Sequence, residues 1–466
     1  MPTESFLIEV GAEATPRSVS LPEWLGKVED RTAQIGIIGL GYVGLPLTLL
    51  LSEERFRVTG FDIDIQKVET LNAGNSYIHR IEPEHIHTAQ RSGFEATSDF
   101  ARIAAMDAVL ICVPTPLHED HSPDMSYVVL TMEALAPHLR SGQLVVLEST
   151  TYPGTTEEIV VETINRYGVA RGVRVLRNGP ESSEELSGVL VAFSPEREDP
   201  GNMITPRRDI PKVIGGVDSR AALAAEALYG SIFRKTVLMS SPAAAEMTKL
   251  LENIYRCVNI ALVNEMKQLC VKMGIDIWEV IDAAATKPFG FQAFYPGPGV
   301  GGHCIPVDPF YLSWKAEQYG FSTRFIELAG EVNESMPQYV VQTAARALER
   351  NGIALRGAKV LVLGVAYKRD VDDLRESPSL TIIELLKRAG ADVAYNDPFF
   401  ETVGRGRKYA LNLTSTPLTE LAGFDCVLIA TDHSEYDYEK IVADSRLVID
   451  SRNATKAYDS PKIVRC

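Results

Sequence analysis

The chain has 466 residues, of which 45% are hydrophobic and 23% charged. This composition is typical of a globular protein with two or three domains. The 46 Lys and Arg against 62 Asp and Glu give a formal net charge of −16, which argues against nucleic acid or an anionic membrane as the main partner. The six cysteines are scattered without paired or metal-type spacing, and no secretory signal opens the chain. We therefore expect a cytoplasmic protein with no disulfides, no metal site and no membrane span.

Residues 1–31 lack clear periodicity and are predicted to form an N-terminal extension. From residue 32 to 238, short β-branched runs alternate with helical stretches, with strands expected at 35–38, 57–61, 108–113, 144–147, 189–193 and 212–216. Strands that alternate with helices predict a parallel, doubly wound sheet.

The central part, residues 239–350, is predicted to be helical. Residues 243–273 have helical spacing and no proline, which predicts one long, mostly buried helix. A second helix is expected at 324–351, where Pro337 must kink or divide it. Strand and helix patterns return at 351–466. The fold class is therefore α/β, with two Rossmann-like doubly wound domains joined by a long-helix central spacer.

A glycine-rich turn follows the first strand. Gly39 permits a tight turn, Gly41 lets a pyrophosphate approach the backbone, and Gly44 lets helix and strand pack closely. Asp62 closes the next strand 18 residues beyond Gly44, where a carboxylate accepts hydrogen bonds from a ribose. Because this carboxylate would repel a 2′-phosphate, the pattern favours NAD over NADP.

Two further loops follow predicted strands, at the edge where a doubly wound sheet binds ligands. The first contains Pro114 and Thr115, and the second contains Thr151, whose hydroxyl is suited to order a water or a substrate hydroxyl. Each loop also has a plain structural interpretation, as a proline-stiffened turn and as ordinary Ser/Thr/Pro loop sequence.

Two other groups have the residue types of acid, base or oxyanion chemistry. Lys249 and Asn253, spaced i,i+4 on the long helix, would stabilise an alkoxide during hydride transfer, although such a pair alone is more often a solvated helix face. The segment 194–202 has three carboxylates in four residues, typical of a solvated turn; its Glu196 is a candidate base for a hydrolytic water.

Cys304 lies in a glycine-rich loop, residues 297–308. Glycine supplies the unusual backbone angles that let a reactive sulfur meet a substrate without crowding. Asp308, four residues on, is a candidate catalytic or orienting carboxylate. A thiol and a hydride acceptor in one protein suggest oxidation through a covalent thio-intermediate.

These motifs together resemble the nucleotide-sugar 6-dehydrogenase family. The resemblance spans nearly all of 34–453 and is carried by residues 39–46, 246–249, Asn253, 299–304, Asp308 and 364–368. It implies a four-electron oxidation of the C6 alcohol of a UDP-sugar by two NAD+. Cys304 would form a thiohemiacetal and then a thioester. Lys249 and Asn253 would stabilise the oxyanion, Asp308 would order a water or act as base, and Glu196 with Thr151 would position and activate water.

The resemblance also implies the binding residues. The cofactor site would comprise Gly39, Gly41, Tyr42, Val43, Gly44, Asp62, Lys67, Pro114, Thr115 and Thr151. The substrate site would comprise Arg256, Asn259, Gly301, Lys368 and Arg452, the last two holding the UDP within the domain at 351–466. A homodimer or higher oligomer through the central helix is expected.

The segments 285–291 and 194–202 most resemble the UDP-N-acetylglucosamine branch of the family, whose product would serve surface polysaccharide synthesis. UDP-glucose and UDP-N-acetylmannosamine are the alternative sugars. A two-electron hydroxyacid dehydrogenase, which has no need of Cys304, and a non-catalytic nucleotide-sugar sensor are alternatives of other classes. The sequence leaves the oligomeric state, the pathway, feedback inhibition and the role of residues 1–31 open.

Overall fold

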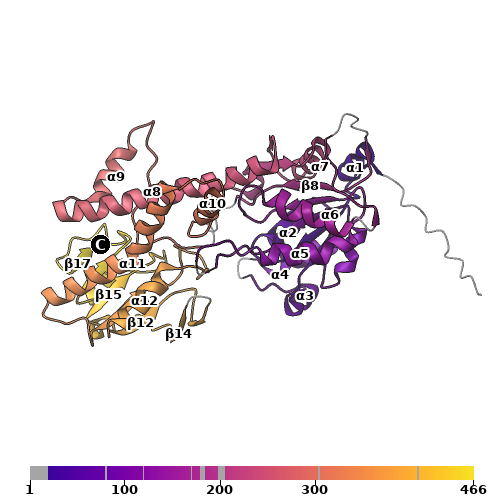
Figure 1. Cartoon of the computed structure of the whole chain (residues 1–466). Coiled ribbons are helices and arrows are strands. Elements are labelled where there is room, and N and C mark those ends of the chain that lie inside the picture. The colour runs from indigo at the N-terminus through magenta and orange to yellow at the C-terminus, as the bar shows by residue number, and fades with distance from the viewer. Residues whose placement is uncertain are drawn as a thin grey trace, which may run out of the picture.

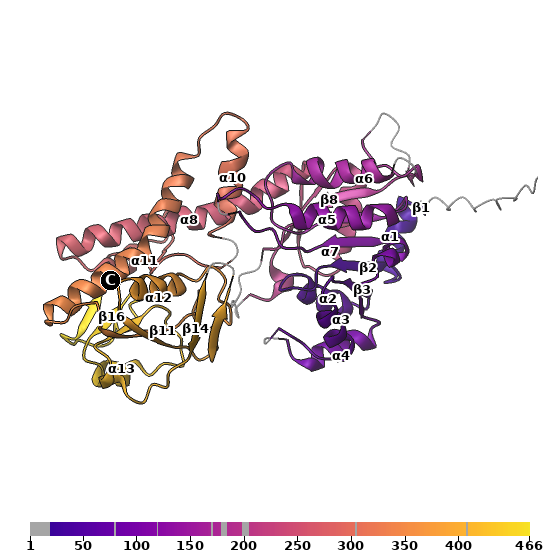
Figure 2. The same cartoon turned by 60° about the horizontal axis from the view of Figure 1, so that its bottom comes forward.

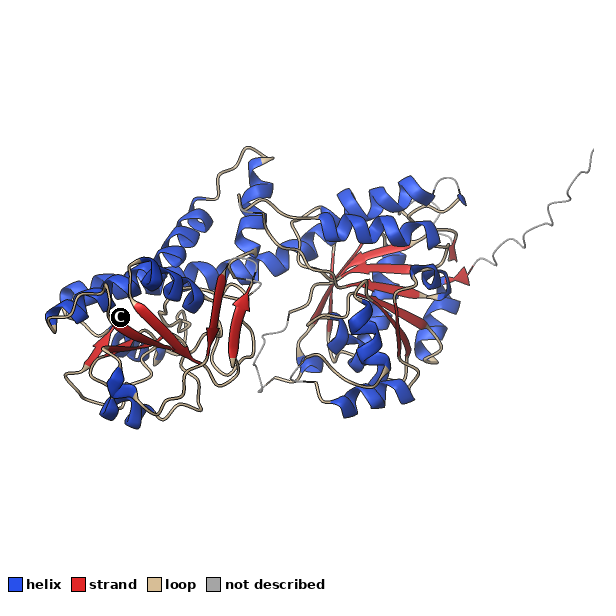
Figure 3. Ribbon diagram, turned by 90° about the horizontal axis from the view of Figure 1, so that it is seen from below, coloured by secondary structure: helices blue, strands red, loops and turns tan. Residues whose placement is uncertain are grey.

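The computed structural model describes residues 19–78, 81–118, 120–168, 171–178, 184–197, 205–302, 305–406 and 409–466. Two β-sheets, one from each half of the chain, lie on either side of a group of long helices (Figure 1). The two sheets are well separated when the molecule is viewed from below (Figure 3). The α/β fold with two Rossmann-like sheets and a helical spacer is therefore confirmed.

The first sheet has eight strands within the described residues, in the order β10-β9-β8-β6-β5-β2-β3-β4. Their bounds are β2 Gln34–Ile38, β3 Arg57–Phe61, β4 Glu95–Thr97, β5 Ala108–Ile111, β6 Leu144–Leu147, β8 Leu190–Phe193, β9 Lys212–Gly216 and β10 Thr236–Met239. Successive side chains enter different hydrophobic clusters: Ala108 and Leu110 face one, Val109 and Ile111 the other. Both faces of the sheet are therefore covered, as in a doubly wound fold.

Helices cover both faces of this sheet. Their bounds are α2 Gly44–Glu53, α3 Ile65–Asn72, α4 Pro83–Arg91, α5 Ser126–Leu135, α6 Glu162–Gly168 and α7 Ser219–Gly230, with a π-helical turn at Thr156–Val161 and 3₁₀ turns at Phe100–Ala105, Ala136–His138 and Arg207–Asp209. Apolar residues of α2, α4 and α7 pack in one cluster, and those of α5 and α6 in the other. Figure 2 shows α5 and α6 together along one side of the sheet.

The prediction of an all-parallel sheet was wrong for β9. This strand pairs antiparallel with β8, through Ala192 opposite Gly216 and Phe193 opposite Gly215, while β10 runs parallel to β9. The described part of the β8–β9 connection contains only a 3₁₀ turn, whereas a parallel neighbour needs a crossover that is usually a helix. Residues 198–204 of this connection lie outside the described residues.

The predicted N-terminal extension contains a helix that the sequence analysis missed. Helix α1 (Leu21–Glu29) follows strand β1 (Val19–Ser20), which pairs antiparallel with β7 (Glu185–Leu186). Ser20 and Glu23 form a capping box at its start, and Trp24 is buried in the core beside α7. Residues 1–18 lie outside the described residues.

The second sheet is parallel, with the order β12-β11-β15-β16-β17. The elements of this half are β11 Lys359–Leu363, α12 Pro378–Arg388, β12 Asp392–Asn396, the hairpin β13 Thr402–Arg405 and β14 Ala410–Thr414, β15 Cys426–Ile429, α13 Tyr438–Asp444, β16 Val448–Asp450 and β17 Ile463–Arg465, with a 3₁₀ turn at Leu421–Gly423. Val360 and Val362 face one cluster, and Leu361 and Leu363 face another, so this sheet is also covered on both sides.

Four helices join the two sheets: α8 (Pro242–Met273), α9 (Ile277–Ala285), α10 (Asp308–Glu317) and α11 (Arg324–Arg350). The predicted long helices are confirmed, and α11 continues past Pro337 without dividing. Helix α8 has 32 residues, a length of about 48 Å, and reaches from the first sheet to the far side of the second (Figures 1 and 2). Throughout the described residues, no helix is both long and apolar enough to cross a membrane.

Candidate active site

The glycine turn lies between β2 and α2. Gly39 has φ +88°, a left-handed conformation, and the N–H group of Leu40 donates to a carboxylate oxygen of Asp62 at 2.9 Å. Lys67 lies 3.6 Å from the same carboxylate. The turn and the strand end thus place backbone N–H groups, a carboxylate and a lysine together, which is the donor and acceptor set that a dinucleotide needs.

The glycines of this turn serve different purposes. A Cβ atom on Gly44 would lie 1.9 Å from the Gly39 carbonyl oxygen, so only glycine permits that approach of helix and strand. A Cβ atom on Gly41 would meet no protein atom within 4 Å, so this face of the turn is open. We therefore expect the pyrophosphate of NAD at this open face, against the N-terminus of α2.

We therefore expect two alanine variants of this turn to behave differently. Gly44→Ala should lower the free energy of unfolding by at least about 1–3 kcal/mol through overpacking. Gly41→Ala should keep the stability of the wild type but weaken NAD binding by about tenfold or more, because its methyl group occupies the cofactor's face. Thermal unfolding and calorimetric titration with NAD separate these effects. Equal stability losses in both variants would contradict this division of roles.

Lys249, Asn253 and Asp308 come together at the helix junction. They are 5%, 4% and 1% exposed, and the Asn253 amide donates to Asp308 Oδ2 at 2.5 Å. Burial raises the pKa of Asp308 from 3.8 to about 6, while the charge of Lys249 and the Asn253 hydrogen bond oppose the rise. A solvated helix face, the alternative for Lys249 and Asn253, is thereby excluded.

This raised pKa has a consequence for stability. Between pH 4 and 6 the folded protein holds a proton on Asp308 that the unfolded chain has released, so stability falls as pH rises through this window and levels off above it. Relative to Asp308→Asn, the wild type should lose about 3 kcal/mol across it. Urea unfolding of both proteins from pH 4 to 7 measures the difference. Parallel pH profiles for the two proteins would refute the expectation.

Asp308 starts α10, and this helix docks on the first sheet. Tyr311 of α10 donates its hydroxyl to the carbonyl oxygen of Thr115 at 2.8 Å, and the Thr115 hydroxyl donates to the Thr150 carbonyl at 2.8 Å. Thr151 is fully buried, and its hydroxyl has no hydrogen-bond partner among the described residues. The carboxyl ends of β5 and β6 therefore lie beside the helix that carries Asp308, while Pro114 is exposed in the same loop.

Cys304 and His303 lie outside the described residues, but the loop on either side is held firmly. The Gly297 N–H donates to Asn264 of α8 at 3.0 Å, and the Gly302 N–H donates to the Arg375 carbonyl at 2.9 Å. Gly301 has no room for a side chain, because a Cβ atom would lie 2.6 Å from the Tyr367 Cβ. These glycines therefore lie between helix α8 and the domain of the second sheet.

One predicted cation of the second domain, Arg452, lies against this loop. Arg452 follows β16, donates to the Ala430 carbonyl at 2.9 Å, and its guanidinium is 2.6 Å from the point a Gly297 Cβ would occupy. Lys368, half-buried, follows β11. In the same domain, Asp397 accepts the Val365 N–H at 2.6 Å beside the turn at Gly364, the arrangement that Asp62 makes in the first domain.

For the other predicted residues, the hydrogen bonds shown are with their own segments of the chain and not with the Asp308 cluster. Arg256 is half-buried on α8, and Asn259 donates its amide to the Tyr255 carbonyl of its own helix at 2.7 Å. Glu196 is half-buried, and one of its carboxylate oxygens accepts the Arg197 N–H at 2.7 Å. Tyr42 is exposed and Val43 half-buried in the glycine turn.

Three residues of the site were missed by the sequence analysis. Arg375 places its guanidinium 4.9 Å from the centre of the Tyr42 ring, which joins the glycine turn to the cysteine loop. Glu246, fully buried, accepts the Gly154 and Thr156 N–H groups at 2.6 and 2.9 Å and so fixes the loop after Thr151. Only Glu246 had a sequence signal, because it lies one helical turn before Lys249. Tyr77 donates its hydroxyl to the Leu40 carbonyl beneath the turn.

Family models match three consecutive parts of the chain. They are described as the UDP-glucose/GDP-mannose dehydrogenase family NAD binding domain, central domain and UDP binding domain, at residues 33–233, 243–335 and 361–457. The chain belongs to this family. It is an NAD-dependent oxidoreductase that acts on nucleotide sugars, as the resemblance implied.

Relatives that are named for different sugar substrates match almost the whole chain. UDP-N-acetyl-D-mannosamine dehydrogenase from Pyrococcus horikoshii is 34% identical over 91% of this chain and 96% of its own. NDP-N-acetyl-D-galactosaminuronic acid dehydrogenase from Ralstonia solanacearum is 34% identical over 92% and 98%. The structure of a UDP-glucose dehydrogenase from Pyrobaculum islandicum superposes with a TM-score of 0.79, at 29% identity over 92% and 96%. These relatives agree with the family of the chain, but their names differ in the sugar that is oxidised.

Proposed function

We propose that this dehydrogenase oxidises the C6 alcohol of UDP-N-acetylglucosamine to the carboxylate, using two NAD+. The carrying observation is the buried Lys249, Asn253 and Asp308 cluster, which lies next to the cysteine loop in a chain that also has the NAD turn. The choice of an N-acetylhexosamine is supported by relatives that act on N-acetylated sugars. UDP-N-acetylmannosamine and UDP-glucose remain the alternatives.

The cluster suits the steps of such an oxidation. NAD+ bound at the glycine turn supplies the hydride acceptor. Lys249 and Asn253 stabilise negative charge on the C6 oxygen, and Asp308 holds the Asn253 amide in place. The first hydride transfer leaves an aldehyde at C6, and the Cys304 thiolate adds to it to form a thiohemiacetal. The second hydride transfer, from this thiohemiacetal, leaves a thioester. Water then hydrolyses the thioester, with Glu196 as the base and Thr151 as a positioning hydroxyl.

Each part of the chain is assigned its own ligand. We assign NAD to residues 32–238, with Gly39, Gly41, Tyr42, Val43, Gly44, Asp62, Lys67, Pro114, Thr115 and Thr151. The UDP belongs to residues 351–466, with Lys368 and Arg452, and the sugar lies against Arg256, Asn259 and Gly301 in residues 239–350. Two local cations and backbone N–H groups suffice to hold a diphosphate on an acidic protein.

A substrate panel tests this function. The enzyme is incubated with NAD+ and each of UDP-N-acetylglucosamine, UDP-N-acetylmannosamine, UDP-N-acetylgalactosamine and UDP-glucose, and kcat/KM is compared. We expect the highest value for UDP-N-acetylglucosamine, with two NADH formed per uronate. A higher value for another sugar would correct the substrate, and one NADH per product would favour a two-electron dehydrogenase.

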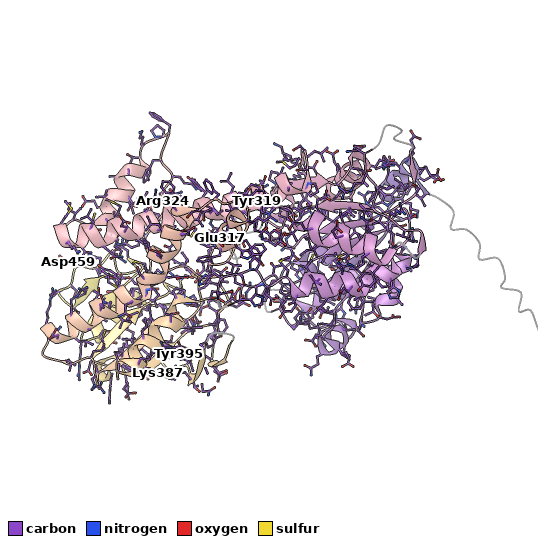
Figure 4. All side chains as sticks on the ribbon, in the orientation of Figure 1. Glu317, Tyr319, Arg324, Lys387, Tyr395 and Asp459 are labelled. Atoms are coloured by element: carbon purple, nitrogen blue, oxygen red, sulfur yellow. The ribbon has the colours of Figure 1, made fainter. Side chains whose placement is uncertain are left out.

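A homodimer or higher oligomer through the central helix is also proposed. Helix α8 has exposed apolar side chains along its length, among them Leu251, Leu262, Met266, Leu269 and Met273. The turn from α10 to α11 adds Tyr319 and Phe325, and Figure 4 shows Tyr319 with Glu317 and Arg324 at this turn. An exposed row of apolar side chains along a helix favours a protein partner, and light scattering on the purified protein measures the oligomeric state.

A further inference from the structure

A buried ion pair lies beneath the Ser194–Glu196 segment, and no step above uses it. Glu148 directly follows β6 and Lys212 begins β9; their side chains are 0% and 4% exposed, and Lys212 Nζ lies 2.5 Å from Glu148 Oε2. The Tyr229 hydroxyl donates to the other oxygen of Glu148. The Glu148 side chain is therefore held in place by both partners.

The same ammonium reaches the segment that carries Glu196. Lys212 Nζ also donates to the Pro195 carbonyl at 3.2 Å, and the Ser194 hydroxyl donates to the Val213 carbonyl at 2.8 Å. Lys212 therefore links the ends of β6 and β8 to β9, at the edge where a doubly wound sheet binds ligands.

Charged groups around Glu196 come from several elements. Arg197 donates to Glu252 of α8 at 3.1 Å and to the Pro211 carbonyl at 2.6 Å. The charge of Glu196 adds to the burial that raises the pKa of Glu148 and of the Cys112 thiol, while the Lys212 charge opposes both rises. Lys212 thus pairs with Glu148 in a buried setting, where charges interact strongly, and holds the carbonyl of the residue before Glu196.

A purely structural reason for this pair is weak. Burying two charges costs more than their attraction returns in many proteins, and an apolar pair of the same size is often as stable. Charged groups retained in such a place point to a role that an apolar pair does not supply.

We propose that Lys212 is a positioning residue for thioester hydrolysis: its ammonium donates to the Pro195 carbonyl and so fixes the segment that carries Glu196, while Glu148 holds the ammonium in place. This inference rests on the proposed function. In the step concerned, the oxygen of water bonds to the acyl carbon and the proton of water passes to Glu196. The carbon–sulfur bond breaks, sulfur leaves as thiolate, and no oxidant is consumed.

Variants at the two positions separate the anchor from the group that holds it. Lys212→Met removes the donor to the Pro195 carbonyl: we expect the rate of thioester hydrolysis at pH 7 to fall about tenfold and thioester to accumulate, while the rate of the first hydride transfer stays unchanged. Glu148→Gln still offers the ammonium an acceptor and should slow hydrolysis by no more than about threefold. The double variant, a neutral pair that the site accommodates, should be as slow as Lys212→Met and no slower, because Glu148 acts through the ammonium.

The measurement is rapid quench of the whole enzyme with NAD+ and the best UDP-sugar of the panel, with intact-protein mass for thioester and chromatography for uronate, from pH 5 to 9. Lys27→Met is the control, because Lys27 pairs with Asp107 at 2.8 Å at the opposite end of β5 and its loss should leave the rate of hydrolysis unchanged. An unchanged hydrolysis rate in Lys212→Met, an equal loss of the first hydride transfer, or a double variant at the wild-type rate would overturn the proposal. A wild type that forms no uronate from any sugar of the panel overturns the proposed function first, and is seen before any variant is made.

Discussion

Replacing Cys304 by serine should lower uronate formation by at least about a thousandfold. A hydroxyl is a far weaker nucleophile than a thiolate, so in the proposed mechanism the aldehyde is no longer captured and the second hydride transfer does not follow. The loop should keep its conformation, because its anchors at Gly297 and Gly302 are backbone N–H groups. NADH absorbance, uronate by chromatography and NAD affinity are measured together.

Cys270→Ala is the matched control for this variant. Cys270 is buried in a small apolar cluster with Ile277 and Ile281, at the end of α8. We expect it to keep activity within about twofold while losing some stability from the smaller side chain. If Cys304→Ser completed both oxidations at the wild-type rate, the thio-intermediate would be excluded and a two-electron mechanism favoured.

Lys249→Met should lower kcat by roughly a hundred- to a thousandfold with NAD affinity unchanged. In the proposed mechanism the ammonium stabilises charge that develops on the C6 oxygen, and methionine keeps the length of the side chain without its charge. Its loss also removes the effect that opposes burial at Asp308, so the pKa of that carboxyl should rise further above about 6.

The control for Lys249 is on the same helix. Lys272 is exposed in the last turn of α8, so Lys272→Met changes the net charge equally and should leave kcat unchanged. Steady-state kinetics and calorimetric NAD titration give both quantities. A Lys249→Met enzyme that kept kcat but lost NAD binding would place this lysine in the cofactor site.

The elements that the sequence predicted well have strong local signals. Residues 243–273 have helical spacing without proline, and the glycine turn follows a β-branched run, so α8 and the turn at Gly39 were placed within a residue or two. Lys249 and Asn253 were paired correctly on one helix face because the spacing of an α-helix determines it.

Contacts between distant segments could not be predicted in this way. Asn264 of α8 donates to Asn333 of α11 at 2.9 Å and accepts from Gly297, but none of the three has a sequence feature that names its partners. The direction of β9 depends on a connection with few local signals, and α1 was missed although Ser20, Pro22 and Glu23 form a recognisable start. Burial of Lys212 and Glu148 is likewise a property of the assembled sheet.

Helix α8 sets a length constraint on the enzyme. Asn253, at the Asp308 cluster, and Asn264, at the Gly297 anchor, are 11 residues apart, which is three helical turns to within about 20°. One inserted or deleted residue between them would rotate one asparagine by about 100° away from its partner. This segment therefore accepts no single-residue change of length, and the number of residues between the two asparagines sets the distance from the Asp308 cluster to the Gly297 anchor.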